Sequence, residues 1–345
     1  MKKFIIFILC LLLIGCNSET NFQGEELFDR EKASYVAAEY MNALSKEEIE
    51  MANSLCEDLV LSEEEVIKLN NNKFKAYKVK EVTEGADYAR IKYLVIRGNN
   101  SEIRADLDSI ELKVNKIDDY YKITEIEAKN VKQVYLDNES LRVIDREVGR
   151  SDLVLRKRDL PKEVFSKGDE VTLTMDTVPN VDFNHVNIGF QGNSIGVSLG
   201  NGKETSIVFT SINDGKKSSG KVSAETEDKN MEDIFEKPIA DKIIGYDLID
   251  AESTEKILFT DNDEALIVQV KESRGGSSVR IYKNPLGELV KLKLDEKFPS
   301  EKYSVDVDKV TEEGIHIKST ALTSDKEFEG DYIIDIENMD VTKDE

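Results

Sequence analysis

The sequence contains no tryptophan and only five prolines, two histidines and three cysteines in 345 residues. A zinc site or a Ser/His dyad would have to use His185 and His316, and each is expected to be an ordinary strand residue. Basic residues are also in the minority, because 47 Lys and Arg stand against 70 Asp and Glu, for a net charge of −23. This balance argues against nucleic acid as a partner and against docking on anionic lipid through a basic surface.

The first 16 residues have the parts of a secretory signal. Lys2 and Lys3 precede an apolar run over residues 4–14, which is too short to span a bilayer. The run ends in Leu13-Ile14-Gly15-Cys16, which resembles the lipobox of bacterial lipoproteins. The resemblance implies removal of a signal peptide, residues 1–15, and attachment of diacylglyceryl, with or without an N-acyl chain, to Cys16. A plain cleaved signal peptide and a transmembrane anchor are the alternatives.

This anchor would leave Cys56 as the single free cysteine. Cys10 departs with the signal and Cys16 carries lipid, so no internal disulfide can form. Cys56 lies in an apolar helical pattern and is expected to be a packed small hydrophobe rather than a reactive thiol. Loss of Lys2 and Lys3 would move the net charge from −23 to −25. The lipid alone would then hold the protein at the cell membrane, on the extracytoplasmic face.

Helical spacing begins after a polar stretch, residues 16–29, which is expected to be a flexible tether. Apolar residues recur at three- and four-residue steps over 33–44 and again over 49–59. Ser45 and Glu48 match a capping box at the start of the second helix. A short third helix is expected after Ser62.

Period-two alternation follows from Phe74 to residue 126, interrupted by turns at 84–87, 98–100 and 116–119. Helices followed by hairpin-joined strands indicate an α+β domain over 30–130. The strand at 87–92 and the hairpin at 119–123 resemble the cone-shaped fold of nuclear transport factor and ketosteroid isomerase. Secreted members usually have tryptophan where Tyr121 stands.

The resemblance implies a pocket at the mouth of the cone, where ketosteroid isomerase uses Asp and Tyr. The residues of these types are Asp106, Asp108, Tyr88 and Tyr93. They are expected to be solvent-face acids and core tyrosines, and no catalytic residue is assigned.

Residues 131–165 are interpreted as a connector with some strand character. Its basic run, Arg156-Lys157-Arg158, is expected to be a solvated strand edge or an interdomain contact.

Residues 166–345 are almost wholly strand-like and contain three related units, near 190–209, 259–281 and 310–336. Each unit has three strands on two hairpins and resembles a degenerate blade of a TolB-type propeller. Three blades are too few for a closed propeller, and the insertion at 213–236 is expected to be disordered.

Two motifs in these units are interpreted as turns. Gly192-Asn193-Ser194-Ile195-Gly196 has the spelling of a nucleophile elbow, but alternating residues follow it where the elbow needs a helix. Asp261-Asn262-Asp263-Glu264 lacks the glycine that an EF-hand requires at its sixth position, where Leu266 stands. A hairpin turn is predicted at both places.

The predicted fold class is α+β, with N-terminal helices packed on a curved antiparallel sheet, followed by a mainly β domain of blade-like sheets. The predicted function is a non-enzymatic binding or protein-interaction module of the cell envelope, anchored to the membrane through Cys16, with envelope proteins as its expected partners. The alternative is a small-ligand carrier or an enzyme that uses the cone pocket. No cofactor and no metal are expected.

Overall fold

A computed structural model of the chain describes residues 28–58, 72–99, 102–165, 175–213, 215–216, 236–273, 275–311, 313–338 and 340–344. Several predictions from the sequence fall outside these segments. They are the signal peptide with Cys16, the tether up to residue 27, the short helix after Ser62 and most of the insertion at 213–236. These remain predictions.

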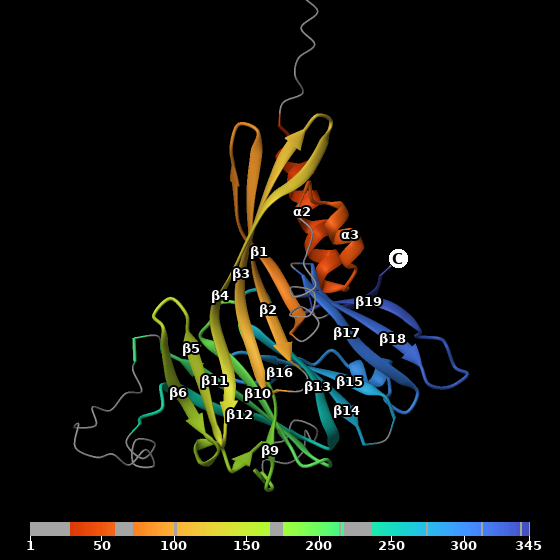
Figure 1. The fold of residues 1–345 in the computed structure, drawn as a ribbon. Helices are drawn as coiled ribbons and strands as arrows, with labels where there is room; N and C mark the ends of the chain where they lie inside the picture. Colours follow the sequence, from red (N-terminus) through yellow and green to blue (C-terminus); the bar gives the residue numbers. More distant parts are fainter. Residues whose placement is uncertain are drawn as a thin grey trace, which may run out of the picture.

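Six antiparallel strands, each beside its neighbours in the chain, form one tall sheet (Figure 1). The strands are β1 (Lys73–Glu84), β2 (Tyr88–Asn99), β3 (Arg104–Ile117), β4 (Tyr120–Asp137), β5 (Ser140–Asp145) and β6 (Arg150–Arg156). Two-residue turns join β3 to β4 and β4 to β5, and both begin with a left-handed residue, Asp118 and Asn138. The predicted domain boundary at residue 130 lies within β4, so one sheet continues into the predicted connector.

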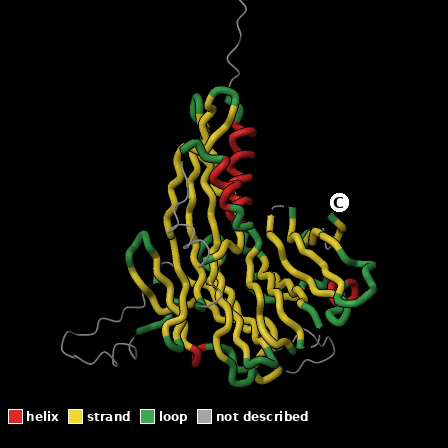
Figure 2. The backbone as a smooth tube through the Cα atoms, turned by 45° about the vertical axis from the view of Figure 1, so that its right-hand side comes forward, coloured by secondary structure: helices red, strands yellow, loops and turns green. Residues whose placement is uncertain are grey.

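Two helices, α2 (Arg30–Ser45) and α3 (Ile49–Ser54), lie beside the upper half of this sheet (Figures 1 and 2). Asp29 caps α2, because its carboxylate accepts the backbone N–H groups of Glu31 at 2.9 Å and Lys32 at 3.2 Å. The buried face of α2 joins strand residues of β2, β3 and β4 in one core. Its fully buried members include Ala33, Ala37, Tyr40, Met41, Ile91, Leu112 and Ile123.

The predicted capping box between the helices is wrong. Ser45 is the last residue of α2, and its hydroxyl donates to the Asn42 carbonyl at 2.8 Å. Glu48 occupies the N-cap of α3 and makes no side-chain capping bond. Glu47 between them has a left-handed φ of 62°, so the chain reverses there and leaves Ser45 with the preceding helix.

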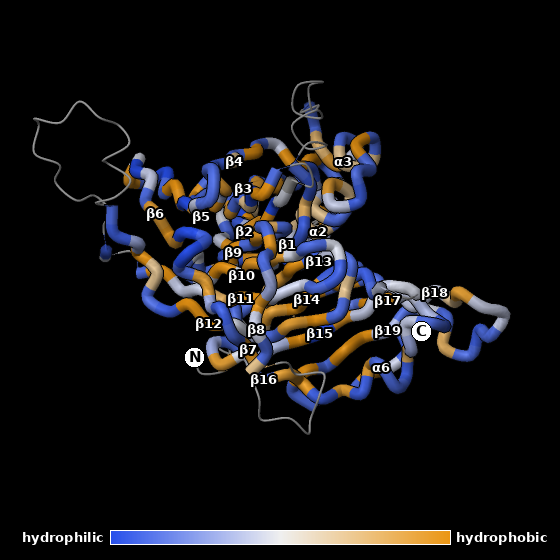
Figure 3. Tube along the Cα trace, turned by 90° about the horizontal axis from the view of Figure 1, so that it is seen from below, coloured by the Kyte–Doolittle hydropathy of each residue, from blue (hydrophilic) through white to orange (hydrophobic). Residues whose placement is uncertain are grey.

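Three four-stranded antiparallel sheets lie below and beside the tall sheet (Figure 1), and the view from below shows them side by side (Figure 3). The first blade sheet contains β9 (Asp182–Ile188), β10 (Ser194–Gly200), β11 (Thr205–Ile212) and β12 (Ala240–Ile249). The second contains β13 (Ala251–Phe259), β14 (Ala265–Glu272), β15 (Ser277–Lys283) and β16 (Glu288–Leu289). The third contains β17 (Tyr303–Thr311), β18 (Gly314–Ala321), β19 (Gly330–Asp335) and β20 (Asp340–Lys343).

Each repeat predicted from the sequence coincides with one blade sheet, which has a fourth strand beyond the three that were expected. The remaining elements are short. They are the two-stranded sheet of β7 (Glu163–Val164) and β8 (Asp176–Thr177), the 3₁₀ turn η1 (Lys157–Asp159) and the one-turn helix α6 (Leu294–Lys297).

Apolar side chains join the lower half of the tall sheet to the first blade sheet. Leu107, Val134 and Leu155 of the tall sheet pack in one core with Ile188 and Val197 of the blade. The first and second blade sheets approach closely at Gly196, where a Cβ atom would lie 2.7 Å from the Leu266 side chain. The absence of a side chain at Gly196 leaves space for Leu266 and Ile257 where the two sheets stack.

The predicted α+β class is wrong, because the protein is mostly β. About 59% of the described residues are in strands and about 11% are in helices. The helical periodicity at 33–44 correctly indicates α2, but α3 is only six residues long. The sheet beside them extends through β6 into the blade-like part, so strands dominate the whole molecule.

Candidate functional site

A cleft of about 380 Å³ lies where α2 and β1 face the turns of the blade sheets, and we name it the α2–β1 cleft. Three parts of the fold build it. The lining residues of α2 and the turn after it are Ala38, Asn42, Ser45 and Lys46; those of β1 and β2 are Phe74, Lys75, Ala76, Tyr77, Lys78, Val79 and Tyr93; those of the blade sheets are Phe190, Asp261, Asp308, Lys309, Val310 and Thr311.

Aromatic side chains form much of the apolar lining. The rings of Tyr77 and Tyr93 meet edge to face at a centroid distance of 6.2 Å. Burial raises the pKa of the Tyr77 phenol, which stays neutral at physiological pH. Phe190 is buried on the blade side, and the Lys78 ammonium lies 5.0 Å from the centre of its ring.

Lysines supply most of the charge in the cleft. Lys78 donates to the backbone carbonyl of Asp261, which fixes its ammonium between β1 and the second blade sheet. Lys46 and Lys309 are exposed at the rim. Burial lowers the pKa of Lys75, and the neighbouring charges of Lys256 and Lys73 lower it further.

The turn that presents Phe190 is held by a buried carboxylate, Asp263. Its two oxygens accept the backbone N–H groups of Phe190 at 2.7 Å and Gln191 at 3.0 Å. Gly189 leaves the space for this contact, because a Cβ atom there would lie 2.3 Å from an Asp263 oxygen. Burial raises the pKa of Asp263, and the two backbone bonds oppose that change. The predicted hairpin turn at 261–264 therefore also fixes one wall of the cleft.

A wider groove of about 550 Å³ adjoins the cleft along the turns of the second and third blade sheets. The two hollows share Asp261, Val310 and Thr311. The groove is acidic, in contrast to the lysine-lined cleft. Its charged lining residues include Glu264, Glu313, Asp335 and Glu337, with a single lysine, Lys283.

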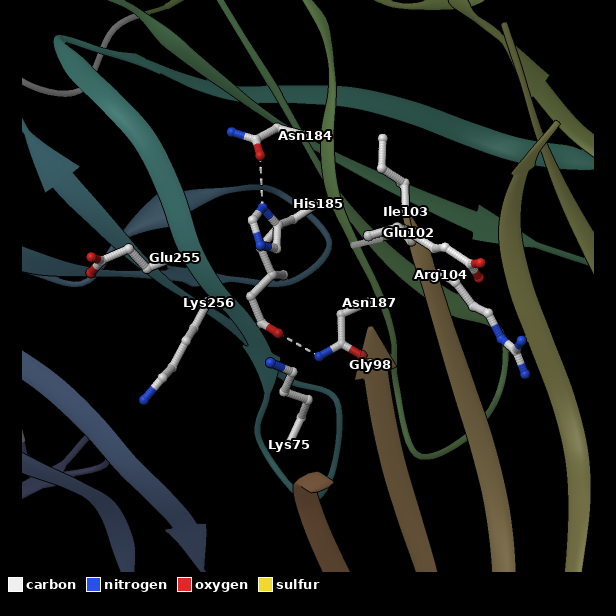
Figure 4. A pocket seen from close by; sticks show the side chains of 12 residues that line it. Lys75, Gly98, Glu102, Ile103, Arg104, Asn184, His185, Asn187, Glu255 and Lys256 are labelled. Carbon is white, nitrogen blue, oxygen red and sulfur yellow. Dashed lines mark hydrogen bonds between the residues drawn. The ribbon is translucent and has the colours of Figure 1, made fainter. Parts of the chain in front are cut away.

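A third hollow is very small, and charged and polar residues make up most of its lining (Figure 4). It surrounds His185 with side chains from β1, from the start of β3 and from β13, including Lys75, Arg104, Glu255 and Lys256. Its volume of about 20 Å³ is enough for one water molecule and too small for an organic ligand. Burial lowers the pKa of His185, with Lys75 adding to the effect, so the imidazole is neutral at physiological pH.

The structure separates the four residues considered for a cone pocket. Tyr93 is a core residue that also lines the cleft, as expected of a core tyrosine, whereas Tyr88 lies at the start of β2, where the Arg90 guanidinium lies over its ring. The prediction of solvent-face acids is wrong, because Asp106 and Asp108 are 1% and 2% exposed.

Arginine and asparagine side chains explain the burial of these two aspartates. Asp106 accepts from Arg104 at 2.9 Å, and Asp108 pairs with Arg97. The Asn130 amide donates to Asp108 at 2.8 Å. These bonds supply the partners that a buried carboxylate needs, so both groups are structural.

The two histidines lie in different sheets, as strand residues. His185 is in β9 and His316 is in β18, where its Nε2 is 3.1 Å from the Thr311 hydroxyl. The described residues contain no group of three or more His, Cys, Asp or Glu side chains that could hold a metal ion. Ser194 is the first residue of β10, which pairs with β11 as a hairpin. The sequence that matches a nucleophile elbow is therefore followed by a strand and not by a helix.

The basic run 156–158 forms a contact between the tall sheet and the blade part, one of its two predicted roles. Arg156 donates to the Glu236 carbonyl at 2.7 Å, and Lys157 pairs with Asp182 at 2.6 Å.

Cys56 is buried beside Ile123, as predicted for a packed small hydrophobe. Within the described segments, no helix has the length and apolarity to cross a membrane.

The cleft itself was not predicted from the sequence. Its residues come from 38–46, 74–93, 190 and 261–311, and each segment alone has an ordinary helix, strand or turn pattern. The one local signal is the lysine spacing at 73, 75, 78 and 80 in an acidic chain.

No protein-family model matches the chain, and no curated protein matches it. Among solved structures, a candidate 6-phosphogluconolactonase from Bacteroides uniformis is 10% identical, with 77% of this chain and 80% of that chain covered at a TM-score of 0.30. Kluyveromyces lactis Hsv2p is 10% identical, with 75% and 72% covered at 0.26. TolB from Acinetobacter baumannii is 11% identical, with 71% and 77% covered at 0.17. Scores this low assign neither fold nor function.

Proposed function

We propose that this protein is a non-enzymatic binding module of the cell envelope, anchored through lipid on Cys16, whose binding site is the α2–β1 cleft. The cleft carries the proposal, because it joins aromatic walls, fixed polar groups and a hollow of about 380 Å³ in one place. Such a combination is typical of ligand sites. The sequence Leu13-Ile14-Gly15-Cys16 supports the anchor.

The surroundings of the buried acids favour binding over catalysis. Asp106 and Asp108 are paired with arginines, and Asp263 holds two backbone N–H groups. Asp247 accepts from Tyr282 and Arg280. Each of these carboxylates has a structural task, and none of them lines the cleft.

Photocrosslinking tests the proposal in producing cells. A photoreactive phenylalanine replaces Val79, which lines the cleft and is 47% exposed. The matched control replaces Leu286, which is 70% exposed in the turn between β15 and β16 and does not line the cleft. We expect a discrete adduct from position 79 and none of that mass from position 286. Identical adducts at both positions, or none at position 79, would contradict the proposal.

A small-ligand carrier is the second candidate function, and the size of the cleft favours it. Small-molecule sites typically have volumes of about 300–1,000 Å³, and the cleft falls in this range. The adduct at position 79 separates the two candidates, since a carrier gives a small mass increase and a protein partner gives a large one.

A further inference from the structure

The α2–β1 cleft has a charge opposite to that of the whole protein. Four lysines line it, Lys46, Lys75, Lys78 and Lys309, against the two carboxylates of Asp261 and Asp308. The chain as a whole has a net charge of −23. A cationic hollow in an acidic body creates a local field that attracts anions and repels cations.

Folding, rather than local sequence, brings these lysines together. Lys46 follows α2, Lys75 and Lys78 are on β1, and Lys309 is on β17 of the third blade sheet. β1 and β17 contact each other, which places Lys309 across the cleft from β1. Lys78 is held in place by the Asp261 carbonyl and by the ring of Phe190, so part of the positive charge is preorganised.

Lys75 lines both the cleft and the His185 hollow, and its ammonium end lies in the hollow beside Asn187 (Figure 4). Its pKa is lowered by burial and then by the charges of Lys256 and Lys73.

The remaining lining is suited to an apolar body. Phe74, Tyr77, Tyr93 and Phe190 contribute rings, and Val79 and Val310 contribute aliphatic surface. Aromatic walls bury a large apolar area with little loss of side-chain entropy. Charge and apolar surface therefore occur in one hollow.

We infer that the α2–β1 cleft binds a compact organic anion, a molecule with an aromatic or aliphatic body and one carboxylate, sulfonate or phosphate group. The body packs against Tyr77, Tyr93 and Phe190, and the anionic group faces the lysines. This inference rests on the proposed function, since it names the chemistry of the ligand for the same cleft.

A pair of probes that differ only in charge tests the inference. The probes are 2-naphthoate and its neutral counterpart 2-naphthamide. Each is titrated calorimetrically into the full-length lipidated protein in dodecyl maltoside, with micelles alone as the blank. We expect 2-naphthoate to bind one site, about fivefold more tightly than 2-naphthamide, which is the scale of exposed ion pairs.

Three variants locate the site and the source of the preference. K46Q/K309Q removes the two exposed rim charges, and we expect the affinity for 2-naphthoate to fall to that for 2-naphthamide. K80Q is the matched control, because Lys80 is exposed like the two rim lysines but lies on β1 outside the cleft lining. It should leave the affinity for both probes unchanged. A38W fills the cleft from the exposed side of α2 and should abolish binding of both probes.

The outcomes separate this inference from the proposed function. Equal affinity for the two probes, or equal losses in K80Q and K46Q/K309Q, would overturn the anion preference. Loss of both probes in A38W would still support the cleft as a binding site. Failure of both probes to bind the unmodified protein would also overturn the inference, and crosslinking at Val79 would then decide the proposed function independently.

Discussion

Burial decides the chemistry of the single cysteine in the described structure, Cys56. The residue is 7% exposed, its Sγ lies 3.7 Å from the Ala52 carbonyl oxygen, and burial is the main cause that raises the pKa of its thiol to about 11. The folded state thus favours the neutral thiol. This contribution to stability is fully present below pH 9 and is lost as the pH rises through 11.

Alkylation measures this effect directly. At pH 9 the folded protein should have a thiolate fraction at Cys56 roughly 50-fold below that of the unfolded chain. We therefore expect iodoacetamide to modify the Cys56 peptide far more slowly in native protein than in urea, as followed by mass spectrometry. The Cys56 peptide in urea is its own control. Equal rates in both states would mean that the thiol is accessible and ionised.

Residue types alone could not predict which polar side chains are buried. Cys56 was predicted correctly, because its neighbours repeat with helical spacing. Asp106 and Asp108 were expected on the solvent face, yet Arg97 and Arg104 make their burial possible. Asp263 was expected only in a turn, and its bonds go to a turn some 70 residues away. Such pairings depend on contacts between distant segments, which one sequence does not display.

At the scale of elements, a buried carboxylate connects the first two blade sheets. Asp247 of β12 is fully buried and accepts from the Tyr282 hydroxyl at 2.7 Å and from Arg280 at 3.2 Å, both on β15. Burial raises the pKa of Tyr282, and the Asp247 charge raises it further. The link therefore consists of a neutral phenol and an arginine that share one carboxylate.

Removing the charge of Asp247 should weaken the contact between these sheets. We expect D247N to lower the free energy of unfolding by about 3 kcal/mol, because Arg280 would keep a largely buried charge without its counter-ion. The control is D306N, whose carboxylate is exposed and pairs with Lys256 at 3.0 Å, with an expected loss below about 1 kcal/mol. Urea unfolding of both variants gives the comparison, and equal losses would argue against a special role for Asp247.

The elements themselves were the most predictable part of the fold. Period-two alternation located β1 to β4 of the tall sheet and the first three strands of each blade sheet, whereas β5 and β6 lie in the predicted connector. It missed the fourth strands for identifiable reasons. β12 lies beyond the long polar insertion, while β16 and β20 are only two and four residues long. A strand of that length is defined by its neighbour, so its own residues carry little pattern.

At the scale of the whole molecule, the predicted α+β class is wrong because it assumed a separate domain of helices and strands that ends at residue 130. The tall sheet continues beyond that residue. β4 passes the predicted boundary without interruption, and the lower half of the tall sheet packs on the first blade sheet. The α2–β1 cleft arises from the same continuity, because it needs α2, β1 and the blade turns together. A site formed by segments that are far apart in the sequence is specified by their packing rather than by a motif.

The position of the molecule in the cell is predicted to depend on one covalent group. After removal of residues 1–15 the acidic body would have a net charge of −25 and would be repelled by anionic lipid, so attachment would come from the acyl chains on Cys16. Two chains, at about 0.8 kcal/mol per buried CH₂, are enough for stable anchoring. Globomycin, which blocks removal of lipoprotein signal peptides, should make a precursor that retains residues 1–15 accumulate.

Immunoblots and mass spectrometry of the N-terminal peptide provide the measurement. C56S is the control, since that variant keeps the lipobox and should respond to globomycin like the natural chain. C16S should carry no lipid at all, because no other cysteine follows the signal at the cleavage point. A mature protein of unchanged size in treated cells would contradict the predicted lipid anchor. The binding module would then need another means of attachment to the membrane.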